Sequence, residues 1–265
     1  EGEGTEWFVE NDSPIHKNNS HYSILRTTHP GARLINDGWD GILVKGNARY
    51  DLSLFIKGNG KIRVSIVADR KTLASCVIKA SADWRQQKSV LTPSSSAGNA
   101  SLVIEPLQEG TIAIDFVSLF PRDTFMGRKN GLRKDLAETI ADLHPRFVRF
   151  PGGCATHGQG IDNIYHWQAT IGKLWERQPD MNIWNYHQTR GLGFYEYFQF
   201  CEDIGAEPLP VLAAGVPCQN SHRGGNGQQG GIPFEHELGG KPSPYTYNGS
   251  PLTMESYLQE LLDLI

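Results

Sequence analysis

Residues 146–154 read RFVRFPGGC, and this stretch decides how the second half of the chain is interpreted. Residues 146–150 favour a β-strand, which the Pro-Gly-Gly sequence then stops. The preceding segment predicts a helix ending at His144-Pro145, because its apolar residues recur at helical spacing. These residues are Leu132, Leu136, Ile140 and Leu143. The stretch is therefore the strand of a helix–strand unit that runs into a glycine turn.

The same order repeats further along the chain. Residues 192–204 predict a second helix, which ends at Gly205, a residue typical of helix C-termini. Residues 207–214 predict a short apolar strand, and a third helix is expected to begin after Thr253 as its N-cap. The residues expected to face inward are Phe194, Tyr197, Phe198, Cys201 and Ile204 in the second helix, and Leu258, Leu261, Leu262 and Ile265 in the third.

The alternation of helices and strands indicates a parallel α/β fold. Helix-to-strand connections take few residues, whereas the strand-to-helix connections, 152–191 and 215–253, are several times longer. Long loops at the carboxyl ends of strands are typical of a (β/α)8 TIM barrel. The alternative is a doubly wound sheet, but no G-x-G-x-x-G turn leads directly from either strand into a helix. Because a barrel needs about 250 residues, residues 122–265 are expected to hold an incomplete barrel, its N-terminal part.

Residues 32–120 have a different period. Residues 50–56 and 61–67 alternate between apolar and polar side chains and are separated by the turn at 57–60. Further short strands are expected at 42–44, 101–104 and 111–117. Strands at this spacing, broken by Gly, Asn and Ser, indicate an antiparallel, jelly-roll-like β-sandwich. The expected domains are therefore a β-sandwich over 1–121 and the barrel portion over 122–265.

Bulk properties exclude several classes of partner. A net charge of -4 and a pI near 6.2 argue against nucleic acid, which requires a basic face. No apolar run approaches the roughly 20 residues of a membrane span, and the acidic start is not a signal peptide. The four cysteines lack CxxC spacing and are expected to be mostly free thiols, and no histidine pattern indicates a metal or cofactor. The sequence leaves the oligomeric state open.

The sharpest candidate site is Arg149 with Gly152 and Gly153. Glycines after a strand end let backbone and an Arg side chain approach a ligand at a barrel mouth. The alternative is a tight turn with the Arg paired to a structural carboxylate, and both interpretations stay open. The following loop contains three tryptophans, Trp167, Trp175 and Trp184. We expect them either to line a sugar cleft or to pack the loop, and the sequence leaves both alternatives open. Glycoside cleavage needs two carboxylates, and no persuasive pair occurs among Glu176, Glu196, Glu202, Glu207, Glu235, Glu237 and Glu255.

Residues 116–125, 130–136 and 149–154 together resemble glycoside hydrolase family 51. The resemblance is strongest to α-L-arabinofuranosidases that carry a carbohydrate-binding-like module near the start of the barrel. Glu176-Arg177 and residues 205–208 extend the match, which is specific over about 115–215.

This resemblance implies a TIM barrel with β-sandwich modules and retaining release of terminal α-L-arabinofuranosyl residues from plant cell-wall polysaccharides. By motif, Arg149 and Cys154 lie at the sugar subsite, and Gly152 and Gly153 shape the turn. The family's acid/base is the Glu of an Asn-Glu pair, and no Asn-Glu dipeptide occurs in this chain. The catalytic residues are therefore expected outside it, so that the segment alone is inactive. The implied partner is an arabinose-containing oligo- or polysaccharide.

Two departures from the family, Arg190 and His157, leave the exact glycan open. Both are expected on the sugar-facing side. The alternatives are a family member acting on another plant-wall glycan, or a non-catalytic carbohydrate-binding protein in which the sandwich binds the glycan. In that sandwich, Asp115 resembles the last-strand Asp that similar modules use near a structural calcium. A carboxylate at a strand end of the folded core explains Asp115 equally well. Relatives with such modules suggest a secreted or periplasmic protein.

Overall fold

The computed structural model describes residues 2–160, 163–213, 215–218, 246–247 and 250–265. The chain divides into two compact units. The first unit comprises Glu1–Ile15 and Ser20–Thr139, and the second comprises His16–Asn19 and Ile140–Ile265. Within the described ranges, none of the helices combines the length and apolarity that a membrane crossing requires.

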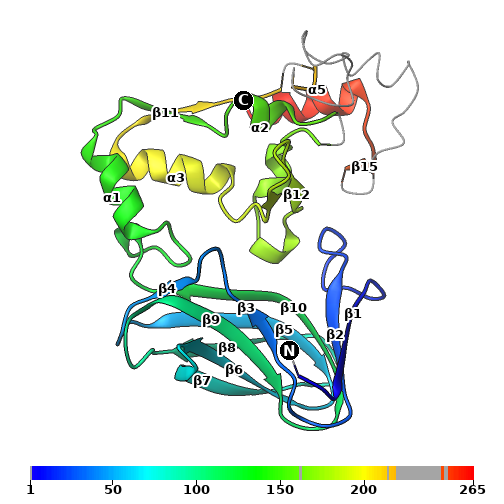
Figure 1. The fold of residues 1–265 in the computed structure, drawn as a ribbon. Coiled ribbons are helices and arrows are strands. Elements are labelled where there is room, and N and C mark those ends of the chain that lie inside the picture. The colour runs from blue at the N-terminus through cyan, green and yellow to red at the C-terminus, as the bar shows by residue number, and fades with distance from the viewer. Residues whose placement is uncertain (1, 161–162, 214, 219–245, 248–249) are drawn as a thin grey trace. The chain divides into compact units, whose positions relative to one another are not determined.

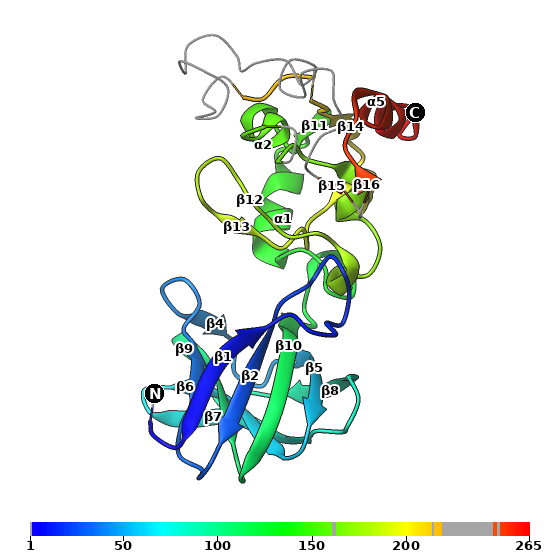
Figure 2. The same cartoon turned by 90° about the vertical axis from the view of Figure 1, so that its right-hand side faces the viewer.

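Two antiparallel sheets build the first unit (Figure 1). One sheet has the order β1 (Thr5–Glu10), β2 (Tyr22–Thr27), β10 (Gly110–Pro121), β5 (Tyr50–Gly58) and β8 (Arg85–Leu91). The other has the order β3 (Leu34–Asn36), β9 (Ala97–Pro106), β6 (Lys61–Ala68) and β7 (Lys71–Lys79), with β4 (Ile42–Val44) also paired to β9. Figure 2 shows β1, β2 and β10 side by side. The antiparallel β-structure predicted from the period of two is confirmed.

One apolar core lies between these sheets. Leu52, Leu54 and Ile56 alternate along β5 with half-buried residues, and all three are buried. Ile62 and Val64 on β6 belong to the same cluster. Apolar and polar residues alternate along these strands because successive side chains point to opposite faces of the sheet. One face of each sheet therefore supplies the core.

The second unit contains the predicted helix–strand order. Its main elements are α1 (Lys134–Asp142, which begins in the first unit), β11 (Phe147–Phe150), α3 (Phe194–Ile204), β14 (Glu207–Pro210) and α5 (Met254–Leu262). Strands β11 and β14 pair in parallel, with Phe147 opposite Glu207 and Phe150 opposite Pro210. Gly205 has a φ of 67° and closes α3, as predicted. Thr253 caps α5 by accepting a hydrogen bond from the Ser256 amide.

Short elements complete the described structure. They are η1 (Phe125–Gly127), α2 (Gly153–His157), η2 (Trp167–Thr170), η3 (Leu174–Glu176), β12 (Asp180–Met181), β13 (His187–Gln188), β15 (Thr246–Tyr247) and β16 (Ser250–Pro251). The parallel sheet of the described residues has two strands, so a closed barrel is not evident among them. β14 also ends at Pro210, four residues before the predicted end at 214.

The predicted inward face of α5 is only partly correct. Leu261 packs against a buried apolar cluster as predicted, but the other three predicted residues are exposed. Leu258 and Leu262 are 52% and 63% exposed, and Ile265 is fully exposed. Tyr257 and Glu260 are buried instead. Apolar residues fall on two adjacent stripes of this helix, so helical spacing alone does not select the one that packs.

Similar errors affect α1 and α3. In α1 the buried residue is Ala137, and the predicted stripe residues Leu136, Ile140 and Leu143 are exposed. In α3, Phe194 and Cys201 are buried as predicted, but Phe198 is exposed and Phe200 is buried. The elements were therefore predicted more accurately than the faces they bury.

Candidate functional site

The turn after β11 is held by an aromatic cluster beneath it. Phe150 is buried and stacks on Tyr197 of α3, with ring centroids 4.6 Å apart. It also meets the edge of Phe194 at 5.4 Å. Phe147 and Arg149 alternate to the opposite face of the strand, where both are exposed. The strand thus fixes one face against α3 and presents Arg149 on the other.

The guanidinium of Arg149 lies along the glycine turn. A Cβ added to Gly152 would lie 3.8 Å from its Nη1, and one added to Gly153 would lie 3.5 Å from its Nη2. Gly152 has a φ of 120°, a conformation that side-chain-bearing residues rarely adopt. Within the described part of the chain, the Arg149 guanidinium makes no ion pair with a carboxylate and no side-chain hydrogen bond. The described residues therefore do not support the alternative in which Arg149 pairs with a structural carboxylate. The five N–H donors of the Arg149 guanidinium stay available to a ligand.

Helix α2 carries the turn into the following loop. Thr156 is fully buried, and both its amide, at 3.0 Å, and its hydroxyl donate to the Gly152 carbonyl. Its own carbonyl accepts from the Tyr165 amide at 2.9 Å. These bonds satisfy the backbone at the turn and hold it in one conformation.

Cys154 lies in α2, directly after the two glycines, and is half-buried. Its thiol forms a hydrogen bond with the Cys218 thiol, which together with burial raises the pKa of Cys154 above its usual value. His157, at the end of the same helix, has its Nδ1 2.6 Å from the Val216 carbonyl oxygen. Both side chains therefore contact the segment that follows β14.

Arg190 occupies a different environment from Arg149. It is buried, its Nη2 donates to Asp180 at 3.2 Å, and its guanidinium lies 4.2 Å from the centroid of the Tyr165 ring. The charge of Arg190 is neutralised by Asp180 inside the loop. Arg190 therefore stabilises the packing of this loop.

Arg177 and Glu196 form the main ion pair of this loop. The guanidinium binds the carboxylate through two bonds, of 2.7 and 2.9 Å, and is 4% exposed. Arg177 also donates to the Arg190 and Gly172 carbonyls, at 2.8 and 3.1 Å. Glu196 in turn accepts from the Gly193 amide at 2.9 Å, which caps α3. Glu196 thus joins the Arg177 loop to the start of α3.

A buried contact joins His166 to Glu260, and it was not predicted from the sequence. Their Nδ1 and Oε2 atoms lie 2.6 Å apart, and both side chains are almost fully buried. The Glu260 carbonyl also accepts from the Trp167 indole at 2.8 Å. No local sequence signal identified this contact, because the two residues lie 94 positions apart.

Further candidate residues from the sequence include two tryptophans and two glutamates. Trp167 packs against the Phe150 cluster, whereas Trp184 is exposed. Glu235 and Glu237 lie outside the described residues. In the described part of the chain, no three His, Cys, Asp or Glu side chains gather in a way that would hold a metal ion.

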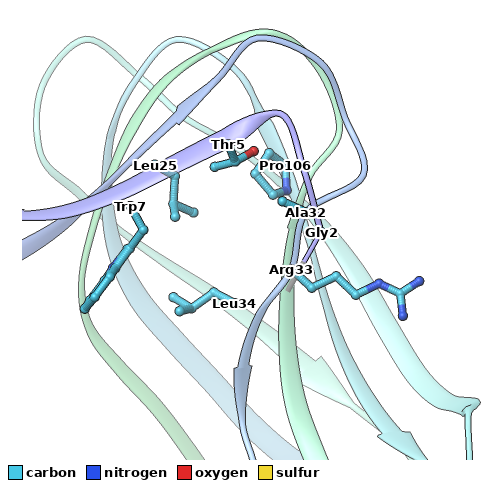
Figure 3. Close-up of a pocket in the computed structure, with 8 residues that line it drawn as sticks. All are labelled: Gly2, Thr5, Trp7, Leu25, Ala32, Arg33, Leu34 and Pro106. Carbon is cyan, nitrogen blue, oxygen red and sulfur yellow. The ribbon is translucent and has the colours of Figure 1, made fainter.

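A separate pocket of about 190 Å³ lies in the first unit (Figure 3). Its lining residues are Gly2, Thr5, Trp7, Leu25, Ala32, Arg33, Leu34 and Pro106. Trp7, Leu25 and Leu34 surround the same space, and Arg33 points away from it. Trp7 is 56% exposed, so part of the residue is open to solvent.

Asp115 lies at the start of a β-bulge in β10. The register with β5 shifts between Asp115, which pairs with Phe55, and Ser118, which pairs with Ser53. Its carboxylate accepts from the Phe116 amide at 2.6 Å, where Phe116 has a φ of 46°. This contact satisfies one oxygen of the Asp115 carboxylate within the bulge.

Comparisons with known proteins give this geometry a context. Residues 139–262 match the model of the alpha-L-arabinofuranosidase 1 domain. The extracellular exo-alpha-L-arabinofuranosidase of Streptomyces chartreusis is 37% identical over 227 residues, which cover 80% of this chain and 27% of the relative. Alpha-L-arabinofuranosidase 1 of Arabidopsis thaliana is 36% identical over 196 residues, covering 70% of this chain and 28% of that protein.

A solved structure agrees with these relatives. An arabinose-bound MgGH51 α-L-arabinofuranosidase superposes with a TM-score of 0.80 at 30% identity, covering 99% of this chain and 41% of that one. The matched relatives and the matched fold define a class, the glycoside hydrolases of the arabinofuranosidase type. Within it, the chain belongs to glycoside hydrolase family 51. It spans less than a third of the length of the curated relatives it matches.

Proposed function

We propose that the chain holds part of the sugar-binding site of a retaining glycoside hydrolase, and that the whole protein releases terminal α-L-arabinofuranosyl residues from plant cell-wall polysaccharides. One observation carries the proposal most directly. Arg149 is an exposed cation without a carboxylate partner among the described residues, and it lies along the turn at Gly152 and Gly153. Planar guanidinium donors in a rigid setting suit the hydroxyl oxygens of a sugar ring.

The chemistry of cleavage is assigned to residues outside this chain. A retaining enzyme needs two carboxyl groups about 5 Å apart, one acting as acid/base and one as nucleophile. Among the described glutamates, Glu196 is bound to Arg177, Glu260 to His166 and Glu176 to Lys173. Carboxylates held in this way serve the structure, so the role proposed for this chain is to bind and orient the sugar.

We further propose that residues 122–265 form the N-terminal part of a (β/α)8 barrel and residues 1–121 a carbohydrate-binding-like sandwich. The parallel pairing of β11 with β14 supports the barrel, as do the short connections that lead into each strand. In such a barrel the turn at Gly152 follows the carboxyl end of a strand, where active sites are built.

The proposed substrate is an arabinose-containing oligo- or polysaccharide, and the proposed location is outside the cytoplasm. Both follow from the relatives, one of which is named as an extracellular exo-enzyme. A net charge of -4 agrees with a neutral glycan partner and disfavours nucleic acid.

Replacing Arg149 tests the sugar-binding role. In the full-length protein, Arg149→Ala is expected to lower kcat/KM on an aryl α-L-arabinofuranoside by about ten- to a hundredfold, because a charged hydrogen bond to the sugar is lost. Arg146→Ala, at an exposed residue just before the same strand, is the matched control and should leave kcat/KM within about twofold. Equal kcat/KM for Arg149→Ala and wild type would reduce Arg149 to a structural residue of the turn.

Activity of the separate segment tests where the catalytic residues lie. The 265-residue chain alone is expected to be inactive on the aryl arabinofuranoside, while the full-length protein turns it over. Robust hydrolysis by the segment would contradict the assignment of both catalytic carboxylates to the rest of the protein.

A second candidate function, glycan binding by the first unit, is supported by the pocket beside Trp7. Exposed aromatic rings next to a pocket suit the apolar face of a sugar. Trp7→Ala should weaken retention of the full-length protein on insoluble arabinan, whereas Trp39→Ala, at an exposed tryptophan outside the pocket, should not. Equal retention of both variants and wild type would exclude this pocket as a glycan site.

A further inference from the structure

Two cysteines far apart in the sequence meet beside the glycine turn. Cys154 lies in the first turn of α2, and its thiol is hydrogen-bonded to that of Cys218, in the segment after β14. The other two cysteines differ, since Cys76 lies on β7 of the first unit and Cys201 is buried in α3. We propose that Cys154 and Cys218 are a modification site, a thiol pair that closes reversibly to a disulfide.

Backbone contacts hold the two cysteines in register. The Cys218 amide donates to the Gly158 carbonyl at 3.0 Å, and the Gly158 amide donates to the Cys154 carbonyl at 3.0 Å. His157 adds the contact between its Nδ1 and the Val216 carbonyl oxygen at 2.6 Å. The segment around Cys218 is thus attached at two points, His157 and Gly158, to the C-terminal end of α2. The bond would therefore join two segments that backbone contacts already hold next to each other.

Burial assigns a different role to each thiol. Cys154 is half-buried and is the sulfur that a dissolved oxidant reaches, whereas Cys218 is 2% exposed. The raised pKa of Cys154, caused first by its hydrogen bond with Cys218, keeps the thiolate scarce at neutral pH. Pairing should therefore accelerate as the pH rises toward the pKa of Cys154.

The reaction is thiol–disulfide exchange with a small disulfide such as oxidised glutathione. The Cys154 thiolate attacks one glutathione sulfur, the glutathione S–S bond breaks, and the released thiolate takes up the proton. Cys218 then loses its proton and attacks Cys154 Sγ, which expels the second glutathione. Two protein thiols are oxidised to one disulfide, and one disulfide oxidant is reduced to two thiols.

The bond would tie the turn to the segment after β14. Cys154 directly follows Gly152 and Gly153, so the link would restrain the backbone that carries the turn. The pairing does not depend on the proposed glycosidase activity. It concerns two thiols that approach through the fold of the second unit.

Peptide mapping of the full-length protein tests the pairing. The protein is incubated with oxidised glutathione at neutral and at alkaline pH, alkylated, and digested without reductant. We expect a Cys154–Cys218 linked peptide, lighter by two hydrogens than the two free peptides together, which forms faster at alkaline pH and disappears with dithiothreitol. Cys76→Ser, the matched control, should leave the linked peptide unchanged, and Cys218→Ser should abolish it.

Two results would overturn the proposal. One is full alkylation of Cys218 in wild-type protein whose Cys154 carries a stable glutathione. The other is a disulfide from Cys154 to a cysteine other than Cys218. Both are read from the wild-type protein, so the test does not require a variant to fold. Hydrogen exchange gives a second readout, since the Gly158 and Cys218 amides should exchange more slowly in the oxidised form than in the reduced form.

Discussion

The two units of the chain are held together in different ways. The first has one apolar cluster of 18 buried residues between two antiparallel sheets. In the second, the described residues form two clusters of four buried apolar residues each. Buried polar contacts lie beside them: Arg177 with Glu196, Arg190 with Asp180 and His166 with Glu260. The first unit is therefore organised by apolar burial, and the second depends to a larger extent on directional contacts.

This difference matches the roles proposed for the two units. Apolar burial is non-directional and stabilises a sheet without fixing the details of its loops. A bidentate Arg–carboxylate pair fixes distances and angles, and so orders long loops around a binding turn. The cost is that each buried charge depends on its partner.

The largest expected effect is on the second unit. Glu196→Gln should destabilise it by about 3–5 kcal/mol, because the buried Arg177 guanidinium loses its counter-charge. Native-state hydrogen exchange of α3 measures this loss. Glu176→Gln, which breaks the surface pair with Lys173, is the matched control and should cost less than about 1 kcal/mol. Equal small effects for both variants would remove the distinction between the two units.

A smaller effect is expected in the first unit. Leu54 is fully buried on β5, and Leu54→Ala should cost about 3 kcal/mol by leaving a cavity in the core. Urea unfolding followed by hydrogen exchange of β5 and β6 gives the value. Leu43→Ala, at an exposed position on β4, should change stability by less than about 0.5 kcal/mol. A neutral Leu54→Ala would show that apolar burial does not dominate this unit.

The smallest effect is the alkaline titration of Tyr197. Burial raises the pKa of Tyr197 to about 12, above the value of about 10 in an unfolded chain. A raised folded pKa means that the stabilising contribution is fully present below about pH 10 and is lost between about pH 10 and pH 12. Tyrosinate absorbance should thus show a late-ionising group that disappears in Tyr197→Phe. Ionisation of that group near pH 10 would mean that the Phe150–Tyr197 stack is open to water.

Much of the fold follows from sequence patterns. Alternation predicted β5 and β6 almost to the residue, and helix signals such as Gly205 and Thr253 predicted where α3 ends and α5 begins. Such signals are local, because they depend on backbone conformation and on neighbouring residues.

The faces of the helices and the partners of the charges were not predictable in this way. Leu258 and Leu262 fit the apolar pattern of α5, yet Glu260 is the residue that is buried, opposite His166. The partner lies 94 residues away in the sequence, and a periodic pattern carries no information about it. For the candidate site, the motif identified Arg149, Gly152, Gly153 and Cys154, but it did not predict that Cys218 would lie beside Cys154.

The sequence by itself determined the order of the elements, the change from a period of two to helical spacing near residue 121, and the glycine turn after β11. The tertiary structure decided which charges are neutralised and which stay available. Arg177 and Arg190 are buried against Glu196 and Asp180, while Arg149 stays exposed along the turn. The physical reason is that secondary structure depends on near neighbours in the chain, whereas burial and charge pairing depend on segments that meet only when the chain is folded.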